Sequence, residues 1–509
     1  MGSSASTPAA PKASSSEKAS YASSAASAAD LLAALSLRSS STPADPSGHV
    51  TADLLSTWEH AFSSSAKNRL ASTVLSKTNF TEALIETSRA VADPQVFNTK
   101  IALEGAPVTN QKSSGRCWLF AMTNLVRIEM MKKYDLDEFQ LSQSYLFFVD
   151  SLSKANWFLE QMLDLADEPL EDRLVQYLCS EPENDGGQWD MAQALVSTFG
   201  LVPQSVYPES FNSSNTGRLD TLVTSKLREY ALELRGLYAA SMRSLDESLD
   251  SKSHLEKKAL AIQSARRRKE AQMEEVYRLL AIALGAPPKP TDTFTWEYYS
   301  KSDKKYHKVE ATPLSFYKDH CQVDLSRHVS LIDDPRNKHG LYSVDRLGSV
   351  VGQRPVTYLN VGADKLKETA IKVLKSGQPV WFGCDVGKFS SSTQGLMDHK
   401  IWALDDAFGT NLGMDKAQRL RTGDSAMTHA MLLTAVHIED GKPVRWRVEN
   451  SWGPDACNKG YMAMSDGWFT ENVFQVVADR KYVDKELVDL FDHGKAHVLP
   501  RWDPMGALA

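Results

Sequence analysis

Cysteine, long apolar runs and unbalanced charge are all scarce in this sequence. Its five cysteines among 509 residues are scattered and include no C-x-x-C pair, which excludes a disulfide framework and a zinc site of the usual spacing. No apolar run approaches the roughly 18 residues of a membrane-spanning helix. Lys and Arg total 57 against 64 for Asp and Glu, and the net charge of −7 argues against a protein that coats nucleic acid.

What is present is the composition of a globular chain. Hydrophobic residues make up 42% and charged residues 24%, which excludes a mainly disordered or fibrous protein. At roughly 150 residues per domain, the length predicts three to four domains. The odd number of unpaired cysteines favours a reducing compartment, so we expect a cytoplasmic protein.

Residues 1–50 form a Ser/Ala-rich segment that predicts a disordered tail, because it cannot bury enough apolar surface to offset chain entropy. Only residues 28–37 have leucines spaced for a short amphipathic helix. The start M-G-S-S-A-S fits the pattern for myristoylation of Gly2. The serines also fit a mitochondrial transit peptide, although Arg38 is the only arginine before residue 69. Lipidation, import and a plain solvated tail remain open alternatives.

The most informative window surrounds Cys117. A polar, turn-rich run over residues 110–115 gives way to apolar residues at helical spacing, which predicts a helix with Cys117 in its first turn. The helix dipole and free backbone N–H groups there favour thiolate over thiol. From this window alone, a small buried hydrophobic residue is the competing interpretation.

Two later segments favour catalysis. Residues 428–436 predict a buried strand with His429 near its start, and residues 444–448 predict a second strand that ends in a turn containing Asn450. A lone histidine on a strand is more often a core residue than a catalyst. A thiolate nucleophile, however, needs an imidazole base and a third group that orients it, and Cys117, His429 and Asn450 supply these roles together.

At this point the sequence resembles the papain-like cysteine peptidases. The resemblance rests on Gln111 six residues before Cys117, on G-R-C-W at residues 115–118, on His429 with its following alanine, and on N-S-W-G at residues 450–453. It implies an α+β fold, with a papain-like core made of a helical half and a β-barrel-like half. It also implies that Gln111 helps form the oxyanion hole and that Trp452 shields the contact between His429 and Asn450.

Two departures indicate the branch of the family. The usual C-G-[SA]-C-[WY] is S-G-R-C-W at residues 114–118, so the first cysteine and its disulfide are absent. His429 lies 312 residues after Cys117, where ordinary members place it about 130–150 residues downstream. Together with W-D-P-M-G-A-L-A at residues 502–509, these two departures make the sequence resemble the bleomycin hydrolase branch of the family. The resemblance runs from about residue 60 to the end.

This branch implies a substrate cleft closed at one end. Gly186 and Gly187 would line the non-primed side and pair with the substrate main chain, which glycine allows to approach closely. Outside this context an ordinary turn would be the better interpretation. The last residues, ending at Ala509, would lie in the same cleft, so that their carboxylate pairs with the α-amine of a substrate.

The long spacing between Cys117 and His429 predicts inserted structure. Residues 219–284 have a strongly helical pattern, with one apolar face over residues 219–238. A second helix is predicted from about residue 254 and is stopped by Gly285 and two prolines. The resemblance implies a helical arm that assembles six subunits. The basic run at residues 266–269 is followed by Glu270, Glu274 and Glu275, which favours an ion-paired face over nucleic-acid binding. We predict a tail at 1–50, a helical core part at 51–210, the arm at 211–345, a β-rich core part at 346–490 and a C-terminal arm at 491–509.

The expected function is that of a thiol aminopeptidase acting on peptides through a Cys-His-Asn acyl-enzyme. The resemblance implies bleomycin and homocysteine thiolactone as secondary substrates, with no metal and no cofactor. The alternative from another class is a catalytically idle hexameric scaffold that binds nucleic acid or protein.

Overall fold

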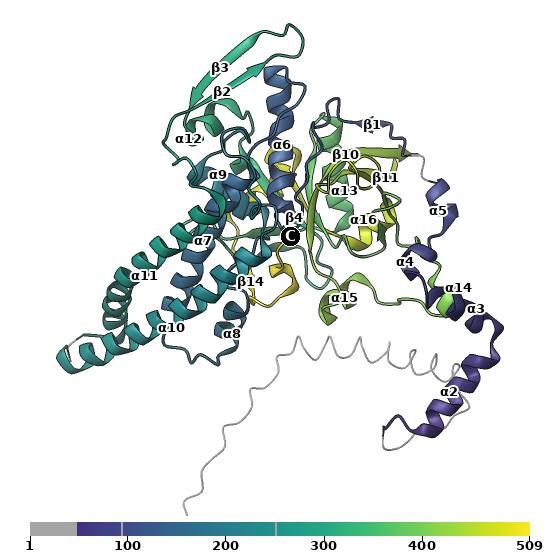
Figure 1. The fold of residues 1–509 in the computed structure, drawn as a ribbon, viewed down its shortest axis with the longest axis horizontal. Coiled ribbons are helices and arrows are strands. Elements are labelled where there is room, and N and C mark those ends of the chain that lie inside the picture. Colours follow the sequence, from purple (N-terminus) through teal and green to yellow (C-terminus); the bar gives the residue numbers. More distant parts are fainter. Residues whose placement is uncertain (1–47, 93–94, 250–251) are drawn as a thin grey trace, which may run out of the picture. The chain divides into compact units, whose positions relative to one another are not determined.

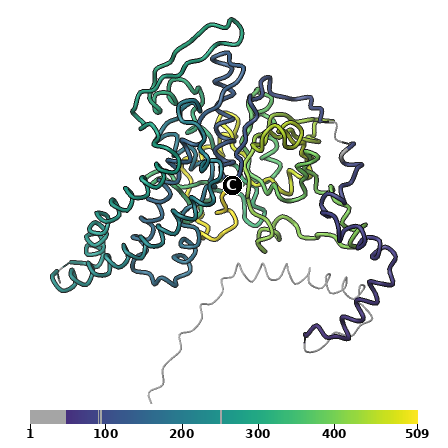
Figure 2. The backbone as a smooth tube through the Cα atoms, in the orientation of Figure 1, coloured from purple at the N-terminus to yellow at the C-terminus, as the bar shows by residue number. Residues whose placement is uncertain are grey.

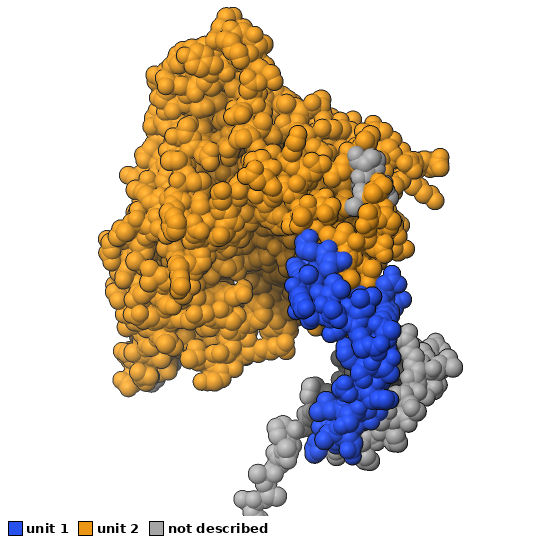
Figure 3. Space-filling view, turned by 45° about the vertical axis from the view of Figure 1, so that its right-hand side comes forward, with its two compact units in different colours: residues 1–83, 405–409 blue, residues 84–404, 410–509 orange. Residues whose placement is uncertain are grey.

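The computed structural model describes residues 48–92, 95–249 and 252–509. The predicted tail therefore lies outside the described residues up to position 47, as do the predicted short helix at 28–37 and Gly2. The chain divides into two compact units, which are coloured separately in Figure 3. The first includes residues 48–83 and 405–409, and the second holds residues 84–404 and 410–509.

The first unit consists of short helices whose ends are capped by side chains. Thr51 and Ser65 occupy the N-cap positions of α2 and α3, where their hydroxyls accept free backbone N–H groups. Neither α2, α3 nor α4 contains a buried residue. The helices are α2 (Ala52–Ser64), α3 (Ala66–Leu75), α4 (Phe80–Ala83) and most of α14 (Leu404–Phe408).

In the second unit, α7 (Gln143–Asp164) and α9 (Trp189–Phe199) pack on α6 (Cys117–Tyr134), which is buried along most of its length. The neighbouring α7 starts at a Ser142 cap, whose hydroxyl accepts the Tyr145 N–H. The other helices of this region are α5 (Thr87–Ala92) and α8 (Arg173–Ser180). The predicted helix beginning at Cys117 is confirmed.

Two long helices, α10 (Gly217–Ser248) and α11 (His254–Leu284), run side by side and pack on α7 (Figure 1). On α10 the predicted apolar face is buried, except that Leu222 is exposed. The basic run at residues 266–269 forms ion pairs mainly with acidic residues of other helices, not with the glutamates that follow it. Arg266 and Lys269 bind Glu160 of α7, and Arg268 binds Glu233 of α10. Of the expected acidic partners, Glu270 makes a longer contact with Lys269.

A large sheet forms the other half of the second unit. Its strand order is β14-β5-β6-β4-β13-β7-β10-β11-β12-β9-β8, and β1 pairs with β10 off this path. The central strands are rich in β-branched and aromatic residues and are buried on both faces. The strands are β1 (Thr99–Lys100), β4 (His328–Ile332), β5 (Gly340–Val344), β6 (Thr357–Asn360), β7 (Val380–Cys384), β8 (Ser390–Ser391), β9 (Leu396–Met397), β10 (His429–Glu439), β11 (Lys442–Glu449), β12 (Tyr461–Ser465), β13 (Val473–Asp479) and β14 (His497–Leu499).

Helices pack on both faces of this sheet. Along β10, Ala430 and Leu432 join the core around α6, whereas Met431 and Leu433 join the core around α13 (Ala363–Lys375). The remaining elements are the hairpin β2 (Phe294–Tyr299) and β3 (Tyr306–Ala311), α12 (Pro313–Ser315), η1 (Phe316–His320), η2 (Leu325–Arg327), α15 (Lys416–Thr422), α16 (Asp466–Asn472), η3 (Arg480–Tyr482), α17 (Lys485–His493) and η4 (Pro504–Gly506). The C-terminal segment, yellow in Figure 2, returns to the middle of this unit.

The predicted arm at 211–345 is longer than the helical pair. Strand β4 pairs with β13 and β6, and β5 pairs with β6 and β14, so both belong to the large sheet. After the helical pair, the first strand of the large sheet is β4, which starts at residue 328. The predicted β-rich part, by contrast, starts only at residue 346. The error has a physical cause: two five-residue strands after an insertion carry no local signal of the partner they pair with.

Candidate active site

Cys117 begins helix α6 and lies on the side of the helix that faces the sheet. Its side chain is buried, and its sulfur is 3.9 Å from the carbonyl oxygen of Gly115, to which the thiol donates. The backbone N–H groups of Trp118 and Ala430 also contact the sulfur. Because Ala430 follows His429 in β10, this contact brings the start of that strand to Cys117.

His429 is the first residue of β10 and is held there by its neighbours on two strands. It lies opposite Cys384 of β7 in the antiparallel ladder. Its Nε2 atom is 2.9 Å from Oδ1 of Asn450, which directly follows β11. The ring of Trp452 lies 5.2 Å from the imidazole, at an interplanar angle of 33°. The structure thus brings together the three candidate catalytic side chains and the tryptophan expected to cover them.

Burial disfavours the charged forms of both the thiol and the imidazole. It raises the pKa of Cys117 to about 12, outweighing the backbone N–H groups of Ala430 and Trp118, which lower this pKa. The carboxylate of Asp185 raises it further. Burial likewise lowers the pKa of His429 to about 4, against the contact with Asn450. The backbone N–H groups at the helix start therefore favour the thiolate of Cys117, as predicted, but their effect on its pKa is smaller than that of desolvation.

Gln111 is fixed beside the thiol by contacts at both ends of its side-chain amide. Its Oε1 accepts a hydrogen bond of 2.6 Å from the Ser451 hydroxyl, and its Nε2 donates to the Ser114 carbonyl at 2.6 Å. Its backbone N–H donates to the Ser451 carbonyl at 2.8 Å. A side-chain amide nitrogen carries two hydrogens, so one remains available to a bound group.

The two glycines pair with the end of the chain. The Gly187 N–H donates to the Ala509 carbonyl at 3.0 Å, and the Ala509 N–H donates to the Gly187 carbonyl at 3.1 Å. A Cβ atom on Gly187 would lie 2.4 Å from the indole of Trp118, and one on Gly186 would lie 3.1 Å from the Ala509 oxygen. Only glycine fits at the first of these positions without movement of a buried ring.

Two further residues hold this glycine edge and carried no motif in the sequence. Lys154 of α7 donates to the carbonyls of Asn184 and Gly186 at 2.7 and 2.6 Å and forms an ion pair with Asp150. Asp185 accepts the Gly115 N–H through Oδ2, and its carbonyl accepts the indole N–H of Trp118 at 2.8 Å. Asp185 directly precedes the two glycines, so its role here could have been found from the sequence. Lys154 lies more than 30 residues before these glycines, and no local pattern connects it to them.

In the part of the chain that the structure describes, no group of three His, Cys, Asp or Glu side chains is arranged to hold a metal ion. Within the same residues, none of the helices combines the length and apolarity needed to cross a bilayer. All five cysteines are free.

Comparison with known proteins places this geometry in a family. The family model described as Peptidase C1-like family matches residues 49–506. The chain is 42% identical over 463 residues to "Cysteine proteinase 1, mitochondrial" of Saccharomyces cerevisiae, covering 89% of this chain and 92% of the relative. It is 44% identical over 428 residues to mouse bleomycin hydrolase, covering 81% of this chain and 89% of the relative. The crystal structure of PepW from Lactobacillus rhamnosis aligns with a TM-score of 0.83 at 40% identity, over 91% of this chain and all of that one.

These matches run through both halves of the site, from the helix that starts at Cys117 to the strands that carry His429 and Asn450. They confirm the expected papain-like α+β fold and the resemblance to the bleomycin hydrolase branch. The chain belongs to the Peptidase C1-like family and is a bleomycin hydrolase-like cysteine peptidase.

Proposed function

We propose that this cysteine peptidase is an aminopeptidase that removes residues from the N-termini of peptides. The observation that carries the proposal is the pairing of Ala509 with Gly187, in which the chain's own end occupies the edge where a substrate main chain would bind. A peptide can then extend from the thiol in one direction only. The Ala509 side chain and backbone are buried, so this end of the cleft is filled.

The proposed chemistry begins with a proton transfer between two neutral groups. Because Asn450 occupies Nε2 of His429, the free Nδ1 takes the proton of Cys117 as the sulfur attacks the peptide carbonyl carbon. The resulting thiolate and imidazolium attract each other, which offsets the cost of charging each group in a buried site. The remaining Nε2 hydrogen of Gln111 and the Cys117 backbone N–H stabilise the oxyanion.

The second half of the cycle returns the enzyme to its starting state. His429 gives its proton to the leaving amine as the C–N bond breaks, which leaves an acyl-thioester on Cys117. His429 then takes a proton from water, whose oxygen attacks the thioester carbonyl, and the sulfur leaves and regains its proton. Asn450 keeps the ring oriented, and Trp452 covers that contact.

The first test compares hydrolysis of aminoacyl-coumarins by wild type and by Cys117→Ala. We expect the variant to fall to background, because the nucleophile is absent, whereas Cys384→Ala, a buried thiol on β7, retains turnover. Equal turnover of wild type and Cys117→Ala would refute the peptidase chemistry and favour a scaffold without activity.

The second test removes Leu508 and Ala509. We propose that the terminal carboxylate pairs with the substrate α-amine, so deletion should weaken the preference for free N-termini and permit cleavage within N-acetylated peptides. The readout is the ratio of turnover on free and N-acetylated versions of one peptide. An unchanged ratio would show that the C-terminus does not select substrates.

Acyl-enzyme chemistry extends this proposal to other acyl groups. Amides and thioesters react with a thiolate through the same intermediate, so we propose bleomycin and homocysteine thiolactone as secondary substrates. Mouse bleomycin hydrolase, a relative at 44% identity, supports the first of these. Release of each hydrolysed product, measured with wild type and Cys117→Ala, tests them directly.

We also propose a homohexamer and a location in the cytosol or mitochondria. The paired helices α10 and α11 support assembly, because they form an arm outside the catalytic core elements. Light scattering should then give about six times the 56.4 kDa of one chain. The yeast relative is named as mitochondrial, which supports import, and intact-mass measurement of the native protein distinguishes cleavage of the tail from acylation of Gly2. Nucleic-acid binding is not proposed, because Arg266 and Arg268 are committed to ion pairs.

A further inference from the structure

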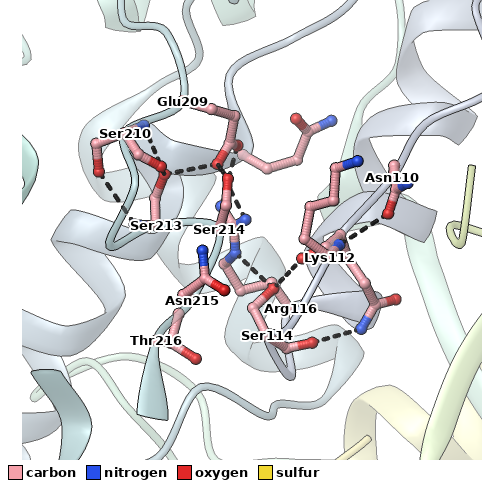
Figure 4. A network of polar contacts seen from close by, with 12 residues as sticks. Asn110, Lys112, Ser114, Arg116, Glu209, Ser210, Ser213, Ser214, Asn215 and Thr216 are labelled. Atoms are coloured by element: carbon pink, nitrogen blue, oxygen red, sulfur yellow. Dashed lines mark hydrogen bonds and ion pairs between the residues drawn. The ribbon is translucent and has the colours of Figure 1, made fainter. Parts of the chain in front are cut away.

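Two segments that are far apart in sequence run beside each other, one ending at Cys117 and the other leading into α10, and Figure 4 shows the polar contacts between them. We call residues 113–117 the nucleophile turn and residues 209–216, which lead into α10, the arm base. The Ser113 N–H donates to the Ser214 carbonyl at 3.1 Å, and the Thr216 N–H donates to the Ser113 carbonyl at 3.3 Å. The backbone of the arm base is thus hydrogen-bonded to the turn that precedes Cys117.

The strongest link between the segments is an ion pair. Arg116 has no exposed side-chain surface, and its two terminal nitrogens each donate to one carboxylate oxygen of Glu209 at 3.0 Å. The Glu209 carboxylate also accepts the Ser213 hydroxyl at 2.6 Å. Planar, bidentate contacts of this kind fix direction as well as distance.

The same guanidinium reaches the oxyanion side of the site. Nε of Arg116 donates to the Ser114 hydroxyl at 3.0 Å, and that hydroxyl donates to the Gln111 carbonyl at 2.6 Å. Gln111 in turn donates to the Ser114 carbonyl. One buried charge therefore organises the turn between the proposed oxyanion donor and the nucleophile.

Ser114 stands where the C-G-[SA]-C-[WY] signature has its first cysteine, and all five cysteines of the chain are free. We propose that Glu209 is a positioning residue for Cys117, and that the arm base, through Arg116, holds the nucleophile turn in place of that disulfide. This inference rests on the proposed role of Cys117. Lys154 holds the glycine edge through the Asn184 and Gly186 carbonyls, whereas Glu209 binds Arg116 and Ser213, so we expect the loss of the Glu209 carboxylate to change substrate binding little. Asp185 joins the glycine edge to both segments, because its Oδ2 accepts the Gly115 N–H and the Thr216 hydroxyl.

The test uses Glu209→Gln, which retains the shape but removes the charge, and Glu209→Asp, which retains the charge but shortens the reach. Active sites are counted by stoichiometric alkylation of Cys117, and kcat per counted site and KM are measured on an aminoacyl-coumarin. We expect kcat to fall about 10- to 100-fold, because a displacement of about 1 Å costs up to about 10²-fold, with KM within about threefold of wild type. A structural defect alone would lower the number of counted sites and leave kcat per site unchanged.

Glu160→Gln is the control, because Glu160 of α7 also receives an arginine through two nitrogens, here Nε and Nη2 of the partly exposed Arg266 on α11. Its kcat per counted site should equal that of wild type. Unchanged kcat per counted site in a folded Glu209 variant, or a change in KM alone, would overturn the inference. If Glu209→Gln does not fold, Glu209→Asp decides. A wild type without amidase activity would instead refute the proposed function, and this inference with it.

Discussion

The sulfur of Cys117 is surrounded by groups that act on its pKa in opposite directions. Backbone N–H groups lower it, whereas burial and Asp185 raise it. The helix start and its donors could be predicted from the sequence, because both are local. The degree of burial could not, because it is created by β10, which is more than 300 residues away.

The oxyanion side of the site can be tested at Gln111. We expect Gln111→Ala to lower kcat by about 10²- to 10³-fold, because it removes a donor that acts when charge develops on the carbonyl oxygen. Ser451→Ala removes only the hydroxyl that holds Oε1 of Gln111 and should cost less. Steady-state kinetics on one aminoacyl-coumarin measure both. Similar kcat values for Gln111→Ala and wild type would remove Gln111 from the mechanism.

The buried carboxyl of Asp190 makes stability depend on pH. It accepts the Thr357 N–H at 2.8 Å, and burial raises its pKa to about 6. The folded state therefore holds this proton more tightly than the unfolded state, so this group makes stability fall as pH rises from about 4 to 6. Asp190→Asn lacks the ionisation penalty, so its stability relative to wild type should be about 1 kcal/mol greater at pH 7.5 than at pH 5. Urea unfolding at both pH values measures the difference, and equal values would contradict it.

Among elements, those with local periodicity were predicted and those defined by distant partners were not. The helical pattern of residues 219–284 predicted α10 and α11, and the short apolar run at 428–436 predicted β10. Strands β4 and β5 were assigned to the arm, because their place in the sheet depends on β13 and β6. In the site, Lys154 and Glu209 were missed for the same reason: each acts on a segment that is distant in sequence.

The glycine edge is sensitive to a single methyl group. In Gly187→Ala the new Cβ would lie 2.4 Å from the Trp118 indole, which cannot move freely because its N–H is bonded to the Asp185 carbonyl. We expect a loss of about 1–3 kcal/mol in unfolding free energy and a higher KM. The matched control is Gly217→Ala at the start of α10, where an added Cβ meets no atom within 4 Å. Equal effects of the two variants would show that the edge tolerates a side chain.

For the whole molecule, stability should not depend on disulfides. All five cysteines are free, so the unfolding midpoint in guanidinium should be the same with and without dithiothreitol. A native disulfide would typically contribute about 2–5 kcal/mol, a difference such a titration detects easily. Activity should respond differently, because oxidation of Cys117 to a sulfenic acid blocks the nucleophile until a thiol reduces it. A midpoint shifted by the reductant would contradict the prediction.

His429 lies 312 residues after Cys117, so the two residues are synthesised at well-separated times. At about 5–20 residues per second, a ribosome needs roughly 15–60 s to pass from the codon of Cys117 to that of His429, its proposed base. The segment that pairs with Gly187 is translated later still. Throughout that interval the growing chain carries Cys117 without this proposed partner. In the proposed mechanism the chain gains its activity only after His429 has been translated, so the nascent chains around it are not exposed to a half-made enzyme.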